Sequence, residues 1–198
     1  RLRTLLDRHC DQYRVVVYLR RQDLLAVSLL STKLKLGGTA LAPVFPRGGD
    51  PYFDRYFDYR GLLERYAVAF GAESITVRIF EEEELAGGSV VEDFRTGIGL
   101  PPGFGVEPPR RRNESLQPAA QQFLAAFNRL ATEGEPTPLK LRTLVGLLER
   151  HFAGRGRLPA RRQAERFLRG FAEDNEWVRQ TFRSDREALF SDDLSMYP

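Results

Sequence analysis

The sequence predicts an α/β fold built on a parallel sheet, followed by a mostly helical C-terminal part. Two apolar, β-branched runs, Val15–Leu19 and residues 74–80 (SITVRIF), have the length and composition of strands. Helical periodicity occupies much of the interval between them, and strands that alternate with helices usually pair in parallel. From residue 110 onward the chain shows only helical patterns.

The first strand leads into the segment around which the chain is organised. Its uniformly apolar composition predicts a strand buried on both faces. Helical periodicity then runs over Gln22–Lys35, and Gly37 with Gly38 supplies a stop. On a helical wheel, the hydroxyl and lysine side chains share one narrow stripe of an otherwise mostly apolar helix. The members of this stripe are Ser28, Ser31, Thr32 and Lys35. We therefore expect a buried helix whose stripe faces something polar.

Arg20 follows the first strand, at the end where ligands of open α/β sheets gather. An arginine together with a helix hydroxyl such as Ser28 suits a phosphate monoester. A structural interpretation is also open. An arginine after a strand can pair with a surface carboxylate, and a helix serine can bond to the carbonyl four residues earlier. The residues alone favour this structural interpretation.

The remaining elements follow from the same signals. Helices are expected over residues 51–57, 59–70, 90–98, 118–132, 138–152 and 161–182. Asp58 is expected to cap the second of these helices, and Val90, Val91 and Phe94 form an apolar face on the third. The four glutamates of residues 81–84 are interpreted as a solvated helix start, where acids favour the positive end of the helix dipole.

Stretches rich in proline and glycine suggest how the chain is divided. Residues 39–50 form a loop long enough to be functional. The Pro/Gly-rich stretch that ends at Pro109 is the best internal boundary. We therefore expect a partial α/β core over residues 1–109 and a helical part, packed on the same domain, over residues 110–198.

Composition excludes several classes of site. Cys10 is the only cysteine, so the sequence offers no intrachain disulfide and no cysteine metal site. His9 and His151 lack metal-ligand spacing, and no metal is expected. No apolar run reaches membrane-spanning length, so no membrane segment is expected.

The basic residues are strongly biased, with twenty-seven arginines against three lysines. A GC-rich genome is the favoured explanation of this bias. The pI of 9.2 raises the alternative of nucleic-acid binding. We expect no nucleic-acid partner, because acids are interleaved with the arginines and no aromatic-basic RNA motif is present. The adjacent Arg110, Arg111 and Arg112 are best interpreted as a solvated face, with anion capture before a helix as the alternative.

Four segments, in order, resemble the PAPS-dependent sulfotransferases, in particular bacterial carbohydrate-type members. They are VVVYLRRQDLLAVSLLS, DYRGLLERYAVAFGAESITVRIFEEEEL, RRRNESLQPAAQQFLAAFNRL and DNEWVRQTFRSDREALFSDDLSMYP, which together span nearly the whole chain. The first is similar to the strand, arginine, helix and serine with which the family binds the 3′-phosphate of its nucleotide. Arg20 and Ser28 have the family's separation of eight residues.

The resemblance implies a P-loop-like sulfotransferase core, here partial, and a function in sulfuryl transfer. The family moves a sulfuryl group from 3′-phosphoadenosine 5′-phosphosulfate (PAPS) to a hydroxyl acceptor, and a carbohydrate is the implied acceptor here. The resemblance implies that Arg20 and Ser28 bind the 3′-phosphate of PAPS or of its product 3′,5′-adenosine bisphosphate. Further candidates for binding this nucleotide are Arg110, Arg111 and Arg112. It favours a cytoplasmic location, as in bacteria, with a luminal one left open.

The acceptor side of such a site is less defined by the sequence. Residues 39–50 and the aromatic side chains of the next segment either border an acceptor cleft or belong to the core, and core is favoured. These aromatic residues are Tyr52, Phe53, Tyr56 and Phe57.

The chain also departs from the family pattern. It lacks the Gly/Ser/Thr-rich 5′-phosphosulfate loop and a catalytic base upstream of Arg20, and His9 lies on the wrong element for that base. Because the chain begins at Arg1 and its only methionine is Met196, we expect a fragment of a longer product. The alternative function is a catalytically inactive nucleotide- or glycan-binding module of the same fold.

Overall fold

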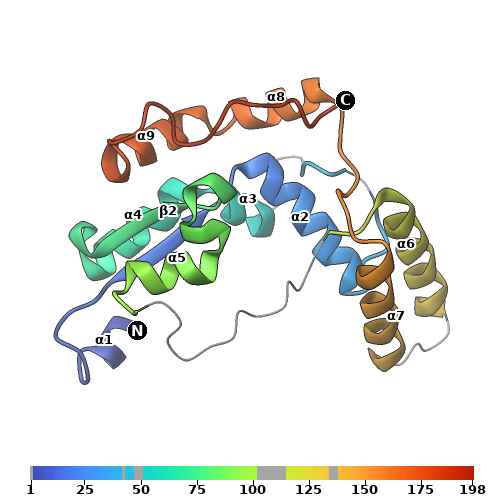
Figure 1. The fold of residues 1–198 in the computed structure, drawn as a ribbon, viewed down its shortest axis with the longest axis horizontal. Helices are drawn as coiled ribbons and strands as arrows, with labels where there is room; N and C mark the ends of the chain where they lie inside the picture. The colour runs from blue at the N-terminus through green and yellow to red at the C-terminus, as the bar shows by residue number, and fades with distance from the viewer. Residues whose placement is uncertain (1, 42, 47–50, 102–114, 134–137) are drawn as a thin grey trace. The chain divides into compact units, whose positions relative to one another are not determined.

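The computed structural model describes residues 2–41, 43–46, 51–101, 115–133 and 138–198 (Figure 1). Over these residues the fold is mixed α/β, mostly helical, with a small parallel sheet of two strands. The chain divides into two compact units. Unit 1 comprises Arg1–Arg21, Gly48–Gly105 and Leu168–Asp192, and unit 2 comprises Gln22–Arg47, Val106–Phe167 and Asp193–Pro198. The boundary expected at residue 109 lies outside the described residues, and each unit draws segments from both sides of it.

Unit 1 is built on β1 (Val15–Leu19) and β2 (Ile75–Ile79), which pair in parallel with Val15 opposite Ile75. Both strands and their parallel pairing confirm the prediction from sequence. The prediction that β1 is buried on both faces is wrong, since Leu19 is buried but the other four residues are only half-buried. The reason is that the described sheet has two strands, so each strand is also an edge.

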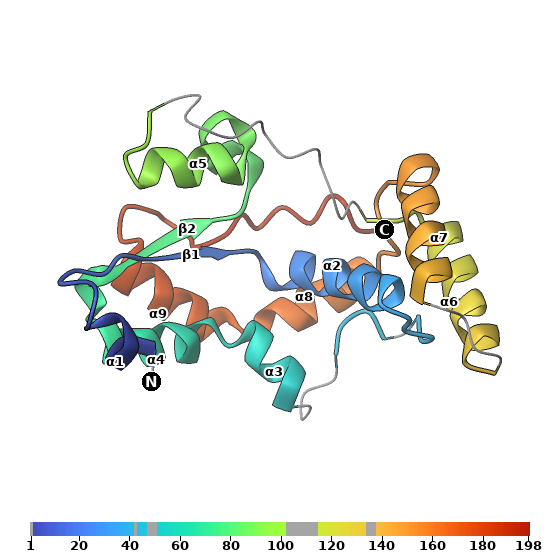
Figure 2. The ribbon, with the colours of Figure 1, turned by 90° about the horizontal axis from the view of Figure 1, so that it is seen from below.

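Helices flank both faces of this sheet. Figure 2 shows α4 (Tyr59–Phe70) and α9 (Ala172–Phe182) on one side of the strands and α5 (Val90–Gly97) on the other. The expected cap of α4 is confirmed, because Asp58 Oδ1 accepts a hydrogen bond from the Gly61 amide at 2.7 Å. Unit 1 also contains α1 (Leu2–Leu6), α3 (Pro51–Phe57) and three 3₁₀ turns, Ala72–Ser74, Glu82–Glu84 and Ala86–Gly88.

A charge cluster joins α5 to the sheet. The Tyr18 hydroxyl donates to Asp93 Oδ2 at 2.7 Å, and Arg78 donates to the same oxygen through Nε at 2.9 Å and to Oδ1 through Nη2. Asp93 is 2% exposed, whereas Phe94 is 43% exposed. Of the expected apolar face, Phe94 is thus largely exposed, while Val90 and Val91 are half-buried. Because a buried carboxylate must be paired, the ion pair with Arg78 sets the rotation of α5.

The acidic run after β2 has a partner that the sequence does not reveal. Glu82 and Glu83 are exposed in a 3₁₀ turn, as a solvated segment should be. Glu84 Oε1, however, lies 2.5 Å from Arg186 Nη1, and its other oxygen lies 3.9 Å from Arg183 Nη2. The acidic run thus ties the end of β2 to the segment that follows α9.

The long helix expected over residues 161–182 is two helices. α8 (Arg161–Arg169) ends before Gly170, and α9 begins at Ala172. Glycine is a poor helix former because its backbone loses more conformational freedom on folding than that of other residues. The uninterrupted helix is therefore a wrong prediction, and Gly170 explains the break.

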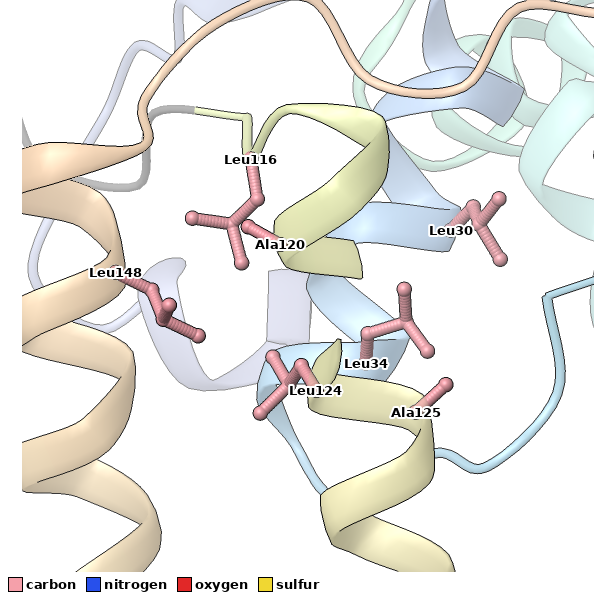
Figure 3. Packing of buried hydrophobic residues seen from close by; sticks show 7 residues of the cluster. All are labelled: Leu30, Leu34, Leu116, Ala120, Leu124, Ala125 and Leu148. Atoms are coloured by element: carbon pink, nitrogen blue, oxygen red, sulfur yellow. The ribbon is translucent and has the colours of Figure 1, made fainter. Parts of the chain in front are cut away.

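Unit 2 packs α2 (Gln22–Lys35), α6 (Pro118–Glu133) and α7 (Pro138–His151) around a common core. The predicted limits of α2 are confirmed, and α6 and α7 both begin at a proline, whose fixed φ suits the first helical position. The buried core residues are Leu30, Leu34, Leu116, Ala120, Leu124, Ala125 and Leu148 (Figure 3).

The polar stripe of α2 faces polar groups of the protein itself. Ser31 Oγ accepts a hydrogen bond from the Leu116 amide at 3.4 Å, and Lys35 Nζ lies 2.6 Å from Glu149 Oε1 in α7. The buried Asn128 of α6 closes the end of α2, because its Nδ2 donates to the Leu34 and Gly38 carbonyls at 2.8 and 2.7 Å. Asn128 thereby joins the last turn of α2 to the glycine turn that follows it.

We predict that Leu124→Ala destabilises the protein strongly, because Leu124 is 0% exposed in the core of unit 2. Removing a buried leucine side chain lowers the free energy of unfolding by about 2–5 kcal/mol. Leu130→Ala is the matched control on the same helix, since Leu130 is 72% exposed. Its effect should stay within about 0.5 kcal/mol. Urea unfolding of both variants measures the difference, and equal effects would contradict the described core.

We also predict that Asp93→Asn destabilises the protein in a pH-dependent way. Burial alone would raise the pKa of Asp93, but hydrogen bonds from Arg78, Tyr18 and the Ala86 amide outweigh it and lower the pKa. The ionised carboxylate therefore stabilises the folded state above its unfolded pKa of about 4, and this contribution is lost as the pH falls through the lower folded value. At neutral pH the variant should lose about 1.5–3 kcal/mol.

Urea unfolding of Asp93→Asn between pH 7 and pH 3 measures this dependence. The difference from the parent protein should shrink below about pH 4. Asp192→Asn removes an exposed carboxylate and serves as the control, with little effect at any pH. A loss of stability for Asp93→Asn that does not change with pH would contradict the role of the charged carboxylate.

Candidate functional site

Arg20 directly follows β1 and lies at the carboxyl edge of the parallel pair, where the sequence places it. Phe80 follows β2 at the same edge, and its amide donates to the Leu19 carbonyl at 2.8 Å. The Arg20 Cζ lies over the Phe80 ring, 5.6 Å from the ring centroid. A cation–π contact of this kind is an attraction between the guanidinium charge and the face of the ring. The parallel pairing therefore gives Arg20 a defined neighbour.

The backbone at the exit of β1 is also fixed. The Tyr59 hydroxyl, at the start of α4, donates to the Arg20 carbonyl at 2.5 Å. The next residue, Arg21, is 4% exposed, and its Nη1 donates to the Ser191 carbonyl at 2.7 Å. The Tyr59 ring in turn lies near the buried Phe190, with centroids 6.2 Å apart. Arg20 is thus half-buried on a backbone that α4 and the segment after α9 both hold in place.

Ser28 lies on α2 and is half-buried in unit 2. Its carbonyl accepts a hydrogen bond from Thr32 Oγ1 at 3.1 Å. Its own hydroxyl makes no hydrogen bond with any residue that the structure describes. The local bond to the carbonyl of Leu24, which the structural interpretation of Ser28 requires, is therefore not made.

The predicted phosphate ligands fall in different parts of the structure. Arg20 belongs to unit 1 and Ser28 to unit 2, so each is placed within its own unit. Their convergence on one phosphate stays a prediction. Arg110, Arg111 and Arg112 lie outside the described residues.

Part of the loop over residues 39–50 borders a pocket within unit 2, which has a volume of about 690 Å³. The pocket is lined by Leu41, Pro43, Val44, Phe45, Pro46, Arg157, Leu158, Pro159, Ala160, Gln163, Arg166 and Phe167. Leu41 and Val44 of this loop also pack, half-buried, against the core of unit 2, in line with the favoured core interpretation, and an acceptor cleft stays a prediction. Phe57 belongs to the core of unit 1, being 3% exposed with its ring 5.8 Å from that of Phe171. Tyr56 is 41% exposed, and the side chains of residues 51–53 lie outside the description.

Sequence reasoning did not single out the far wall of this pocket. Arg157, Gln163, Arg166 and Phe167 form no motif, and they lie more than a hundred residues after the loop that they face. The only local signal was the glycine pair around Arg155, which marks a turn but no ligand.

The described residues contain neither a candidate metal site nor a candidate membrane-spanning helix. No group of three or more His, Cys, Asp or Glu side chains in these residues could hold a metal ion. None of the helices in the same ranges combines the length and the apolar content that crossing a membrane requires.

Comparison with known proteins leaves the function open. No family model matches the chain, and no solved structure matches it. The chain is similar to an uncharacterized protein of Archaeoglobus fulgidus, with 33% identity over 87 residues that cover 44% of this chain and 22% of that protein. The chain therefore spans only about a fifth of the length of this relative. The fold defines a mixed α/β protein.

Proposed function

We propose that this chain is part of a PAPS-dependent sulfotransferase-like protein that transfers a sulfuryl group to a hydroxyl of a carbohydrate acceptor. In this proposal the chain contributes a partial P-loop-like core with the 3′-phosphate-binding half of the donor site. The observation that carries the proposal is the position of Arg20, at the carboxyl edge of a parallel pair and over the Phe80 ring. Ligands of open α/β sheets bind at this edge.

Arg20 and Ser28 divide the work of binding the 3′-phosphate. The guanidinium donates two hydrogen bonds to the phosphate oxygens and neutralises part of their charge. The Ser28 hydroxyl, which has no described partner, adds one neutral hydrogen bond from α2. A hydrogen bond to a charged group contributes about 1.5–3 kcal/mol and a neutral one about 0.5–1.5 kcal/mol, so Arg20 dominates.

The 3′-phosphate itself does not react. The sulfuryl group passes from the 5′-phosphosulfate to the oxygen of the acceptor hydroxyl, which loses its proton, and 3′,5′-adenosine bisphosphate leaves. Such a transfer depends on in-line positioning of donor and acceptor and on stabilising charge. Binding of the 3′-phosphate fixes the nucleotide and selects it over adenylates that lack this group. The proposal assigns no residue of this chain as the catalytic base.

We predict that Arg20→Ala weakens the binding of 3′,5′-adenosine bisphosphate by about 10–150-fold, the equivalent of one charge-assisted interaction. Binding of 5′-AMP should change little, because 5′-AMP lacks the 3′-phosphate. Ser28→Ala should weaken binding of the bisphosphate by about 2–10-fold. Calorimetric titration of both nucleotides measures these effects.

Arg142→Ala is the control for this experiment, since Arg142 is an exposed arginine on α7. It should leave the affinity for both nucleotides unchanged. If Arg20→Ala lost affinity equally for both nucleotides, with unaltered thermal unfolding, the assignment of Arg20 to the 3′-phosphate would be overturned. Tight bisphosphate binding without sulfuryl transfer from labelled PAPS to saccharide acceptors would instead favour the catalytically inactive binding module.

A further inference from the structure

The pocket of unit 2 has the size and the chemistry of a ligand site that the proposed donor site does not use. Its volume of about 690 Å³ falls within the range of small-molecule sites, about 300–1,000 Å³. Neither Arg20 nor Ser28 lines it. We propose that this pocket binds an organic anion whose sulfate, sulfonate, phosphate or carboxylate group is carried on an apolar ring.

One part of the pocket suits the apolar ring. The rings of Phe45 and Phe167 are stacked, with centroids 4.5 Å apart and planes 7° apart. The Tyr197 ring meets Phe45 edge to face, with centroids 6.5 Å apart. Leucine, valine and proline side chains complete this apolar lining. Aromatic and aliphatic walls of this kind bind a flat apolar body through dispersion and the hydrophobic effect.

The other part of the pocket carries cationic and amide side chains that can donate hydrogen bonds. Among the described residues that line it, the polar side chains are Arg157, Gln163 and Arg166, and none is acidic. Gln163 Oε1 already accepts a hydrogen bond from the Ala160 amide at 3.3 Å, which leaves its side-chain N–H groups as donors. Two cations and an amide donor without a local acid favour an anionic ligand.

Arg157, just before α8, and Arg166 on α8 line the pocket, and they differ from Arg161 at the start of that helix. Arg161 Nε lies 3.2 Å from Glu165 Oε1, so its charge is compensated one turn further along α8. Arg157 and Arg166 make no ion pair with any residue in the described ranges. Their charges are therefore uncompensated beside an apolar wall, which is the arrangement that an anion with an apolar body complements.

The wall that carries Arg157 is held in place. The Arg157 amide donates to Gln121 Oε1 of α6 at 3.0 Å. The neighbouring Gly156 approaches the same side chain so closely that a Cβ atom would lie 2.6 Å from Gln121 Nε2. A larger residue at position 156 would require the Gln121 side chain or the loop to shift.

The C-terminal residues hold the opposite part of the pocket. The buried Tyr197 hydroxyl donates to Asp23 Oδ2, at the start of α2, at 2.7 Å. The Arg161 amide, at the start of α8, donates to the Pro198 carbonyl at 2.9 Å. The pocket is therefore largely formed before a ligand arrives, which reduces the conformational entropy that binding must overcome.

The test titrates the protein with naphthalene-2-sulfonate and with naphthalene-2-sulfonamide, a neutral analogue of the same shape. We expect the sulfonate to bind at least about tenfold more tightly, because only it carries the charge. Inorganic sulfate, which lacks the ring, should bind at least about tenfold more weakly than the sulfonate. Calorimetry at constant ionic strength measures all three affinities.

Variants locate the binding site. Arg157→Gln and Arg166→Gln should each weaken sulfonate binding by about 3–10-fold, since both arginines are exposed and therefore partly screened. Neither should change the affinity for the sulfonamide. Arg162→Gln is the matched control, because Arg162 is an exposed arginine on α8 that does not line the pocket. Ala160→Trp, at an exposed lining position, should block both ring probes.

Three results would overturn the proposal. The first is no binding of the sulfonate, and the second is equal affinity for the sulfonate and the sulfonamide. The third is an equal loss of sulfonate affinity in Arg162→Gln and in the two pocket variants. The last would show that overall charge attracts the probe without a defined site. The same variants should leave the affinity for 3′,5′-adenosine bisphosphate unchanged, and a loss there would overturn the separation of the two sites.

Discussion

The parallel pairing of β1 with β2 is the constraint on which unit 1 depends. A parallel pair cannot be closed by a tight turn, so the chain between the strands must cross over and return to the same end. The carboxyl ends of both strands then meet at one edge of the sheet. For this reason Arg20 and Phe80, sixty residues apart in the sequence, lie in contact. The position of the guanidinium is a consequence of strand topology, and a local motif alone would not produce it.

The buried carboxylate of Asp93 determines how α5 covers the sheet. Tyr18 and Arg78 are opposite each other in the register of the strands, and both donate to Asp93. The net contribution of a buried ion pair to stability is small, because desolvation offsets the attraction, but removing one partner leaves the other uncompensated. The cluster therefore mainly determines which packing arrangement α5 adopts, and adds little to overall stability. It fixes one rotation of α5 and leaves Phe94 exposed, although hydrophobicity alone would bury it.

The parts of the fold that the sequence predicted are those set by local signals. The limits of α2, the cap at Asp58 and both strands follow from residues close in the chain, and the edge position of Arg20 follows from a general rule of parallel sheets. The partners of Glu84 and Gln121 lie far along the chain, and no periodicity encodes them. The pocket of unit 2 could not be predicted for the same reason.

The arginine excess also needs to be interpreted residue by residue. Arg60, Arg161 and Arg179 each pair with a glutamate three or four residues away on the same helix, and such surface pairs contribute little. A codon bias accounts for arginines of this kind, because it adds them without regard to place.

Codon bias does not account for the two arginines of the pocket equally well. Arg157 and Arg166 line the same pocket as the stacked phenylalanine rings, and no carboxylate is found among the described residues of that lining. Two cations that line one pocket, with no acid among its described lining residues, raise the positive potential there. A bound anion lowers this positive potential. The electrostatic free energy of the occupied pocket is then more favourable than that of the empty one. A ligand is therefore inferred from the place of these two arginines, unpaired within the described residues, at the apolar pocket, and not from the total number of arginines.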